Sequence, residues 1–239
     1  MNDGWPAVEH GSVEGWSLRF AAGVTQRANS VLPLDAPRDV DAAVAEVERR
    51  SAERWLDAIF QISPAAEPRD LDERLARRGY SAGTPTLVQV MDGSELQRFA
   101  DAAPDPRVEL AERPDADWLE LFWDQEGPRD AEDRAVSRQI LGGSPAVYAA
   151  LRVRGRVEAI ARMALVGGYG GLDCVVTRPE SRRRGYARLV LEALFSEACG
   201  LGLEGLWLQV RESNVGAIVL YDALGFSTAS NYHYRTRSL

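Results

Sequence analysis

Lysine is absent from the 239 residues, so arginine supplies all 28 basic residues, and 36 acidic residues outnumber them. The resulting formal net charge of −8 argues against nucleic acid as a partner, since nucleic-acid-binding surfaces are normally basic. Only two histidines, His10 and His233, are present, and the two cysteines lack zinc-ligand spacing. The sequence therefore predicts no metal.

Long apolar runs are also missing. No stretch approaches the ~20 apolar residues that a membrane span needs, so no membrane association is expected. Residues 1–11 have neither a basic start nor an apolar core, which predicts no secretory signal and a cytoplasmic protein. Cys174 and Cys199 fall within an expected strand and an expected helix. This placement favours buried thiols in a reducing compartment over a disulfide framework.

What remains is a composition typical of globular proteins, long enough for one large or two small domains. Extended and helical patterns alternate along the chain. Helical spacing predicts helices over residues 38–56, 68–80, 115–127 and 130–143. Residues 146–168 read as a hairpin turning at Arg154-Gly155, and a further strand follows. A polar stretch with Pro104 and Pro106 lies between the two halves of the chain.

The two halves resemble each other. Each has a strand with glutamine at a matching position, Gln61 or Gln209, followed by a helix and a final strand. Each of these helices ends in Gly-aromatic, at Gly79-Tyr80 and at Gly225-Phe226. Because helices often end in glycine, this ending alone is weak support. The preceding strand-to-helix passage is echoed too, so we expect a duplicated fold.

The clearest motif is "VVTRPESRRRGYARL", where a β-branched strand gives way to a long apolar helix beginning near Gly185. A helix N-terminus offers unpaired backbone N–H groups and a positive dipole end, which suit phosphate. Gly185 has no Cβ, so a pyrophosphate can approach the backbone closely. The glycine spacing fits neither a Walker loop nor a dinucleotide-binding loop. The alternative is a solvated basic helix start with an incidental glycine.

A second motif is "NVGAIVLYDALGF", which follows a strand ending at Val210. Asn214 is suited to cap the next helix. Tyr221 lies seven positions later, two helical turns away on the same face. A core aromatic is the commoner role for such a tyrosine.

Together, these two motifs resemble the GNAT acyltransferase superfamily. Residues 182–187 match its Gln/Arg-x-x-Gly-x-Gly/Ala acetyl-CoA loop, and the Asn214 helix matches its Asn-x-x-Ala-x-x-x-Tyr-x-x-x-Gly-Phe pattern. The resemblance covers about residues 107–239. It implies tandem GNAT-like α/β folds, each with a mixed, mostly antiparallel sheet flanked by helices. Residues 107–239 would form the catalytic domain. Residues 1–100 would form a degenerate copy whose corresponding turn lacks the glycine and most of the arginines of the acetyl-CoA loop.

The resemblance also implies an activity, an acetyl-CoA-dependent N-acetyltransferase in which a primary amine attacks directly within a ternary complex. Tyr221 would protonate the departing thiolate, and Asn214 would contact the cofactor. An amide of the strand before the loop would polarise the thioester carbonyl. The pantetheine arm would pair with that strand at Cys174, Val175 and Val176. The pyrophosphate would bind the amides of Arg182, Arg183, Arg184, Gly185, Tyr186 and Ala187.

The general base is where the sequence departs from the superfamily. The position that often carries glutamate is Gly170 in this chain. Asp173 is the nearest acid and the candidate base, with a structural or substrate-orienting carboxylate as its alternative role. Glu158 lies on the preceding strand. A water chain can also remove the amine proton.

Two other activities fit the same motifs. One is an aminoacyl-tRNA-dependent transferase built on tandem copies of the fold, which the intact loop and the negative charge disfavour. The other is a non-catalytic acyl-CoA sensor, which Tyr221 and Asn214 disfavour. The expected acceptor is a small-molecule amine or a protein or peptide amine, and the expected assembly is a monomer or homodimer.

Overall fold

The structure is a computed structural model that describes residues 2–125 and 130–239. Glu126 and Gly127, the end of one expected helix, lie outside the described residues. The chain forms two compact units. The larger comprises the segment ending at Trp5 together with Gln89–Gln209 and Gly216–Ser227. The smaller comprises Pro6–Val88, Val210–Val215 and Thr228–Leu239. Neither unit is a continuous stretch of chain.

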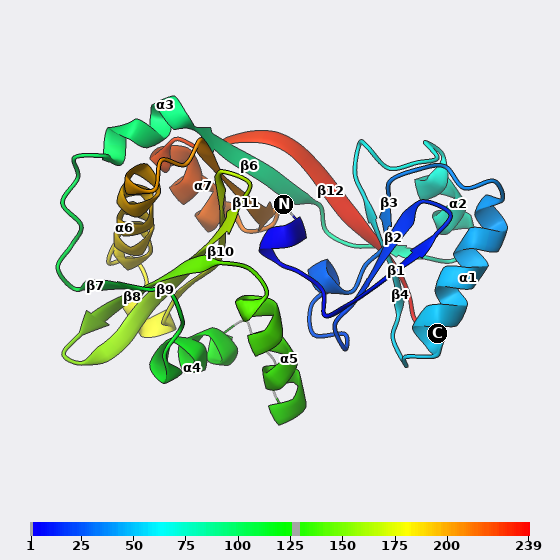
Figure 1. Ribbon diagram of the computed structural model, residues 1–239, viewed down its shortest axis with the longest axis horizontal. Helices are drawn as coiled ribbons and strands as arrows, with labels where there is room; N and C mark the ends of the chain where they lie inside the picture. Colours follow the sequence, from blue (N-terminus) through cyan, green and yellow to red (C-terminus); the bar gives the residue numbers. More distant parts are fainter. Residues whose placement is uncertain (1, 126–129) are drawn as a thin grey trace. The chain divides into compact units, whose positions relative to one another are not determined.

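The larger unit is built on a mixed sheet with the strand order β6-β11-β10-β9-β8-β7 (Figure 1). The pairs β7–β8, β8–β9 and β9–β10 are antiparallel, whereas β10–β11 is parallel. The predicted α/β class with a mostly antiparallel sheet is confirmed. In chain order the strands are β6 (Thr86–Asp92), β7 (Val108–Ala111), β8 (Ala146–Val153), β9 (Arg156–Val166), β10 (Tyr169–Thr177) and β11 (Gly205–Arg211).

Helices cover both faces of this sheet. Helix α6 (Tyr186–Gly200) packs against β8 and β9 on one face, and α4 (Ala116–Gln125) packs against β9 and β10 on the other (Figure 1). The Trp118 indole N–H of α4 donates to the Ala149 carbonyl at 3.1 Å, which satisfies a buried donor. The remaining elements are η1 (Asn2–Gly4), α3 (Gly93–Leu96), η3 (Gln97–Phe99), α5 (Ala131–Gly142), η4 (Pro179–Ser181) and α7 (Val215–Leu224).

Two local predictions in this unit are confirmed. The β8–β9 hairpin turns at Arg154 and Gly155, whose φ angles of 52° and 81° are left-handed. Helix α6 begins directly after Gly185, as its sequence pattern indicates. The apolar side of α6 faces the core: Ala187 is half-buried near its start, and four further residues are buried, Val190, Leu191, Leu194 and Ala198.

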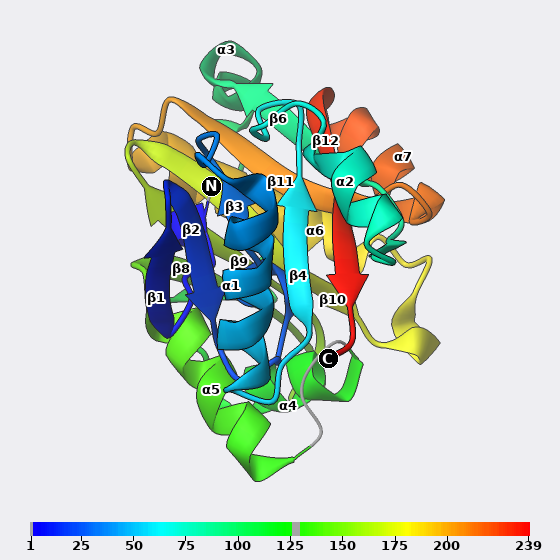
Figure 2. The same ribbon diagram turned by 90° about the vertical axis from the view of Figure 1, so that its right-hand side faces the viewer.

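The smaller unit contains a three-stranded antiparallel sheet, β1-β2-β3, and a second set of strands in which β12 pairs with β4 and β5. Helix α1 packs against β1 and β4 (Figure 2). Phe60 contacts Trp16 and Tyr80 edge to face, at centroid distances of 5.4 and 5.7 Å, in the core. The elements are β1 (Glu9–Val13), β2 (Trp16–Phe20), η2 (Gln26–Ala28), β3 (Leu32–Pro33), α1 (Val40–Ala52), β4 (Ala58–Ile62), α2 (Leu71–Arg77), β5 (Ser81–Ala82) and β12 (Ser227–Arg237).

The similarity between the two halves of the sequence has a structural counterpart. Strand β3, helix α1, strand β4 and helix α2 follow one another as β10, α6, β11 and α7 do. Val31, beside β3, makes a parallel bridge to Phe60 of β4, as β10 is parallel to β11. The last strands of the two halves are exchanged, however. The last strand of the first half, β6, lies beside β11, and the last strand of the second half, β12, lies beside β4. The division into copies at residues 1–100 and 107–239 stays a prediction.

One expectation about the cysteines is wrong. Cys174 and Cys199 are free thiols, but both are half-buried rather than buried. Cys199 lies on the last turn of α6, where its Sγ is 3.2 Å from the Leu96 carbonyl. Within residues 2–125 and 130–239, no helix is both long enough and apolar enough to cross a membrane.

Candidate active site

The strand before the arginine turn is irregular in the middle. Strand β10 pairs with β11 only at Gly170, Gly171 and Leu172, although both strands continue further. On its other side, the pairing of β10 with β9 shifts register between Asp173 and Val176. Cys174, inside this shift, has a φ of 51°, in the left-handed region that a residue with a side chain adopts at a cost. This β-bulge re-aims the backbone at the expected pantetheine position.

The turn that follows forms an open helix start. Arg183 and Gly185 both have left-handed φ angles, 64° and 79°, within one short loop. Successive backbone N–H groups in such turns converge into anion-binding concavities. A Cβ built on Gly185 would meet no atom within 4 Å, so the approach to the backbone is open. Helix α6 has neither a side-chain cap nor an acidic residue in its first turn. Its dipole end is therefore open to a phosphate.

Contacts from β9 hold this turn in place. The Ser181 hydroxyl donates to the carboxylate of Glu158 at 2.7 Å, and both residues are buried. The Arg178 guanidinium donates to the Val157 carbonyl at 2.8 Å. Glu158 is thus committed to supporting the loop, which gives it a structural role. Arg182, Arg183 and Arg184 are exposed on the rim.

Tyr221 is buried in the same unit. Its side chain lies on α7, 7% exposed, with its ring against Phe226 at a centroid distance of 6.0 Å. Burial raises the pKa of Tyr221 to about 12. The phenol therefore keeps its proton at neutral pH, as a general acid must. The same packing also fits the core-aromatic role, so the assignment stays a prediction.

Asp173 belongs to a buried ion pair that the sequence did not indicate. Its carboxylate accepts from the Arg162 guanidinium at 2.7 Å, with the two side chains 6% and 0% exposed. Burial alone would lower the pKa of Arg162, but the charge of Asp173 raises it above its ordinary value. A carboxylate held by a buried guanidinium is stabilised as an anion and is a weak base. Asp173 as the base stays a prediction.

Arg162 connects several elements, and the sequence analysis missed it. Four other acceptors take hydrogen bonds from this guanidinium, and they lie on η1, α5, the loop before β8, and β8 itself. They are the Gly4 carbonyl at 2.9 Å, the Leu141 carbonyl at 3.0 Å, the Ser144 hydroxyl at 2.8 Å and the Tyr148 hydroxyl at 3.2 Å. The available signal was a single arginine inside the apolar run "EAIARMALV", since a charged residue on a buried strand needs partners.

Gly170 and Asn214 are two further positions that the sequence analysis singled out, and their surroundings differ. A Cβ at Gly170 would lie 2.6 Å from Leu206 Cδ2 and 2.8 Å from Met163 Sδ, so no larger side chain fits there without rearrangement. Asn214 directly precedes α7 but lies in the segment Val210–Val215 of the smaller unit. Its contact with a cofactor stays a prediction. In the part of the chain that the structure describes, no group of three or more His, Cys, Asp or Glu residues could hold a metal.

Comparisons with known proteins show the family to which the chain belongs. The family described as "Probable histone acetyltransferase Rv0428c C-terminal" matches residues 1–237. The chain belongs to this family of GNAT N-acetyltransferases. It is 30% identical over 237 residues to "Uncharacterized N-acetyltransferase YobR" of Bacillus subtilis, covering 98% of this chain and 94% of that protein.

Two further similarities concern part of the sequence and the fold. The chain is 40% identical over 81 residues to "[Ribosomal protein bS18]-alanine N-acetyltransferase" of Salmonella typhimurium, which covers 33% of this chain and 55% of that protein. The solved structure of a GCN5-related N-acetyltransferase from Kribbella flavida matches with a TM-score of 0.70 at 17% identity, covering 96% of this chain and 89% of that one. That likeness supports the fold of this GNAT N-acetyltransferase.

Proposed function

We propose that this N-acetyltransferase takes its acyl group from acetyl-CoA and transfers it to a primary amine by direct attack within a ternary complex. The observation that carries the proposal is the open start of α6. It combines left-handed Gly185, free space where a side chain would lie, and a first turn without acids. A pyrophosphate fits these features better than any neutral ligand does.

The neighbouring residues have matching roles in this proposal. Backbone amides of residues 182–187 bind the pyrophosphate, and the arginine rim attracts the 3′-phosphate. The β10 bulge at residues 174–176 presents backbone groups to the pantetheine arm and to the thioester carbonyl. Acetyl-CoA supplies the activated acyl group. Tyr221 donates its phenolic proton to the sulfur that leaves.

The amine must lose a proton before it attacks. Asp173 is the only acid on β10, but its ion pair with Arg162 makes it a poor acceptor. A water chain is therefore the favoured route for that proton. In this arrangement Asp173 acts by holding the strand that carries the bulge.

Calorimetry with acetyl-CoA tests the site. We expect micromolar-class binding, about −8 kcal/mol. Gly185→Glu places a carboxylate where phosphate must lie, so its dissociation constant should rise at least about tenfold, or about 1.4 kcal/mol. Gly155→Glu is the matched control, because Gly155 has a similar φ of 81° and equally open surroundings in the β8–β9 turn. Equal affinity for both variants and the parent would remove residues 182–187 from the site.

Turnover then separates this proposal from its alternatives. Release of free CoA with an amine, without any tRNA, is expected of an N-acetyltransferase. Binding without turnover of any amine would indicate a sensor. Turnover only with aminoacyl-tRNA would indicate the other transferase class.

A further inference from the structure

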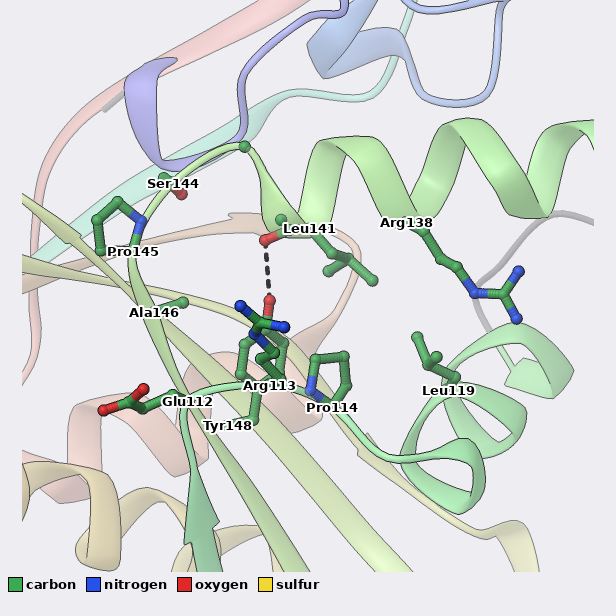
Figure 3. A pocket seen from close by; sticks show the side chains of 12 residues that line it. Glu112, Arg113, Pro114, Leu119, Arg138, Leu141, Ser144, Pro145, Ala146 and Tyr148 are labelled. Atoms are coloured by element: carbon green, nitrogen blue, oxygen red, sulfur yellow. Dashed lines mark hydrogen bonds between the residues drawn. The ribbon is translucent and has the colours of Figure 1, made fainter.

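A pocket of about 660 Å³ opens in the larger unit between the end of β7, the C-terminal end of α5 and the start of β8 (Figure 3). We refer to it as the α5 pocket. Its floor is apolar and buried, formed by Leu119, Leu141 and Tyr148. Arg113 and Arg138 stand at its mouth, and both are exposed. Its volume lies in the range of sites that hold small ligands or peptide side chains.

The charge at the mouth is unbalanced. Glu112 also lines the α5 pocket, but Figure 3 shows its carboxylate pointing away from both guanidinium groups. No ion pair joins Arg113 or Arg138 to a carboxylate within residues 2–125 and 130–239, whereas many other arginines of the chain are paired. Arg138 lies over the Trp123 ring at 4.5 Å, which orients its side chain. An anionic group above an apolar body is the complementary ligand.

The α5 pocket is linked to the reaction centre by hydrogen bonds. Ser144 and Tyr148, two of its lining residues, contact Arg162 at 2.8 and 3.2 Å. Arg162 in turn holds Asp173 at 2.7 Å, next to the bulge residue Cys174. The side chains of Tyr148, Arg162 and Asp173 therefore meet on one face of the sheet. The α5 pocket and the bulge share that face.

The strand register gives the distance between the α5 pocket and the β10 bulge. Ala146, on the pocket wall, pairs with Ala164 of β9, which pairs with Gly171 of β10. Two interstrand steps amount to about 10 Å, and three residues along β10 to Cys174 add about 10 Å in the perpendicular direction. The straight line from the pocket wall to the bulge is therefore about 14 Å and passes the fully buried Arg162, so a bound chain that runs over this cluster needs at least four extended residues.

We propose that the α5 pocket is a second subsite for the acceptor, binding an acidic side chain of a peptide at least four residues from the amine that is acetylated. Arg113 pairs with the carboxylate, Arg138 adds positive charge at the rim, and the apolar floor takes the methylene groups of the side chain. The proposal rests on the proposed acetyl transfer at the bulge and adds the class of acceptor, an acidic peptide.

Synthetic decapeptides test this arrangement. Each carries one amine, at its N-terminus, and neutral residues except for a single Glu placed at one position from 2 to 8. With saturating acetyl-CoA, kcat/KM should peak with Glu at position 5, 6 or 7. The peak should exceed the all-Gln peptide by about threefold to fivefold, as expected for one exposed ion pair. The gain should appear in KM, because the contact is the same before and during reaction.

Variants locate the effect. In Arg113→Gln/Arg138→Gln the peak should disappear, while kcat/KM for the all-Gln peptide stays within about twofold of the parent. Arg154→Gln, an exposed arginine in the β8–β9 turn away from the α5 pocket, should keep the peak. No dependence on Glu position, or a peak that survives in the double variant, would overturn the proposal.

The remaining outcomes are also decisive. If acetyl-CoA binds and small amines are acetylated but no decapeptide is, the acceptor is not a peptide and this inference is wrong while the proposed function stands. If acetyl-CoA does not bind, the proposed function itself has failed. The two failures are thus distinguishable in one set of measurements.

Discussion

Removing the hydroxyl of Tyr221 separates proton transfer from packing. Tyr221→Phe keeps the ring, its contact with Phe226 and most of its buried surface. If the phenol protonates the departing thiolate, kcat should fall and acetyl-CoA affinity should change little. If Tyr221 only fills the core, kcat should stay near the parental value.

The size of the fall follows from the pKa of the donor. Burial raises the pKa of Tyr221 to about 12, whereas an ordinary thiol has a pKa of about 8.5. Because the phenol is a weaker acid than the thiol, it gives up its proton to the leaving sulfur less readily than a donor of matched pKa would. A single proton-transfer group contributes about 10²- to 10⁴-fold. We expect the lower end, roughly 10²-fold in kcat, or about 2.7 kcal/mol.

The pH profile gives an independent check. The active form of Tyr221 is protonated, and its pKa lies above the ordinary value. Activity should therefore not decline through ionisation of Tyr221 until the pH approaches about 12. A loss of activity centred near pH 10 that is absent from Tyr221→Phe would contradict the role of burial in setting this pKa.

Steady-state rates with one accepted amine, beside cofactor binding by calorimetry, form the assay. Tyr80→Phe is the control for removing a buried tyrosine hydroxyl, since Tyr80 donates to Glu48 at 3.0 Å in the smaller unit. Tyr80→Phe is expected to cost about 1 kcal/mol of stability without a large change in kcat. A Tyr221→Phe enzyme that retains more than about half the parental kcat would refute the reasoning, provided that a single-turnover experiment shows chemistry to be rate-limiting.

Two further predictions concern the number of cofactor sites and the stability of the larger unit. Calorimetry should show one acetyl-CoA per chain, because the turn "LDAPRD" of the first half has no glycine; two bound molecules per chain would contradict this. Arg162→Met should lower the free energy of unfolding by about 3–5 kcal/mol in urea denaturation, because Asp173 is left buried without its partner. Adding Asp173→Asn should recover part of that loss, and an Arg162→Met loss below about 1 kcal/mol would count against the ion pair.

Much of the larger unit was predictable because its signals are local. The Arg154-Gly155 turn, the start of α6 at Gly185 and the apolar face of α6 each depend on neighbouring residues. The two motifs predicted the superfamily, and the family match over residues 1–237 confirms it.

The pairing of the last strands was not predictable in this way. Strand β6 lies beside β11 and β12 beside β4, so each half of the chain completes the sheet of the other unit. Local pattern indicates that a strand exists and which face is apolar, but it does not specify the partner strand. The choice between them depends on long-range contacts that a single sequence does not reveal.

The bulge in β10 shows why the candidate site could be located but not understood from sequence. Cys174 holds a left-handed φ of 51°, which costs a non-glycine residue roughly 1–2 kcal/mol. Such a conformation persists only when its surroundings over-determine it. On one side Arg162 holds Asp173, and on the other Ser181 and Glu158 hold the loop that leads to α6. These two buried contacts join residues that are 11 and 23 positions apart, so the irregular backbone is supported by β9 as well as by the motif itself. The motif marks where the cofactor is expected to bind, whereas Arg162 and Glu158 set the shape of the backbone that would receive it.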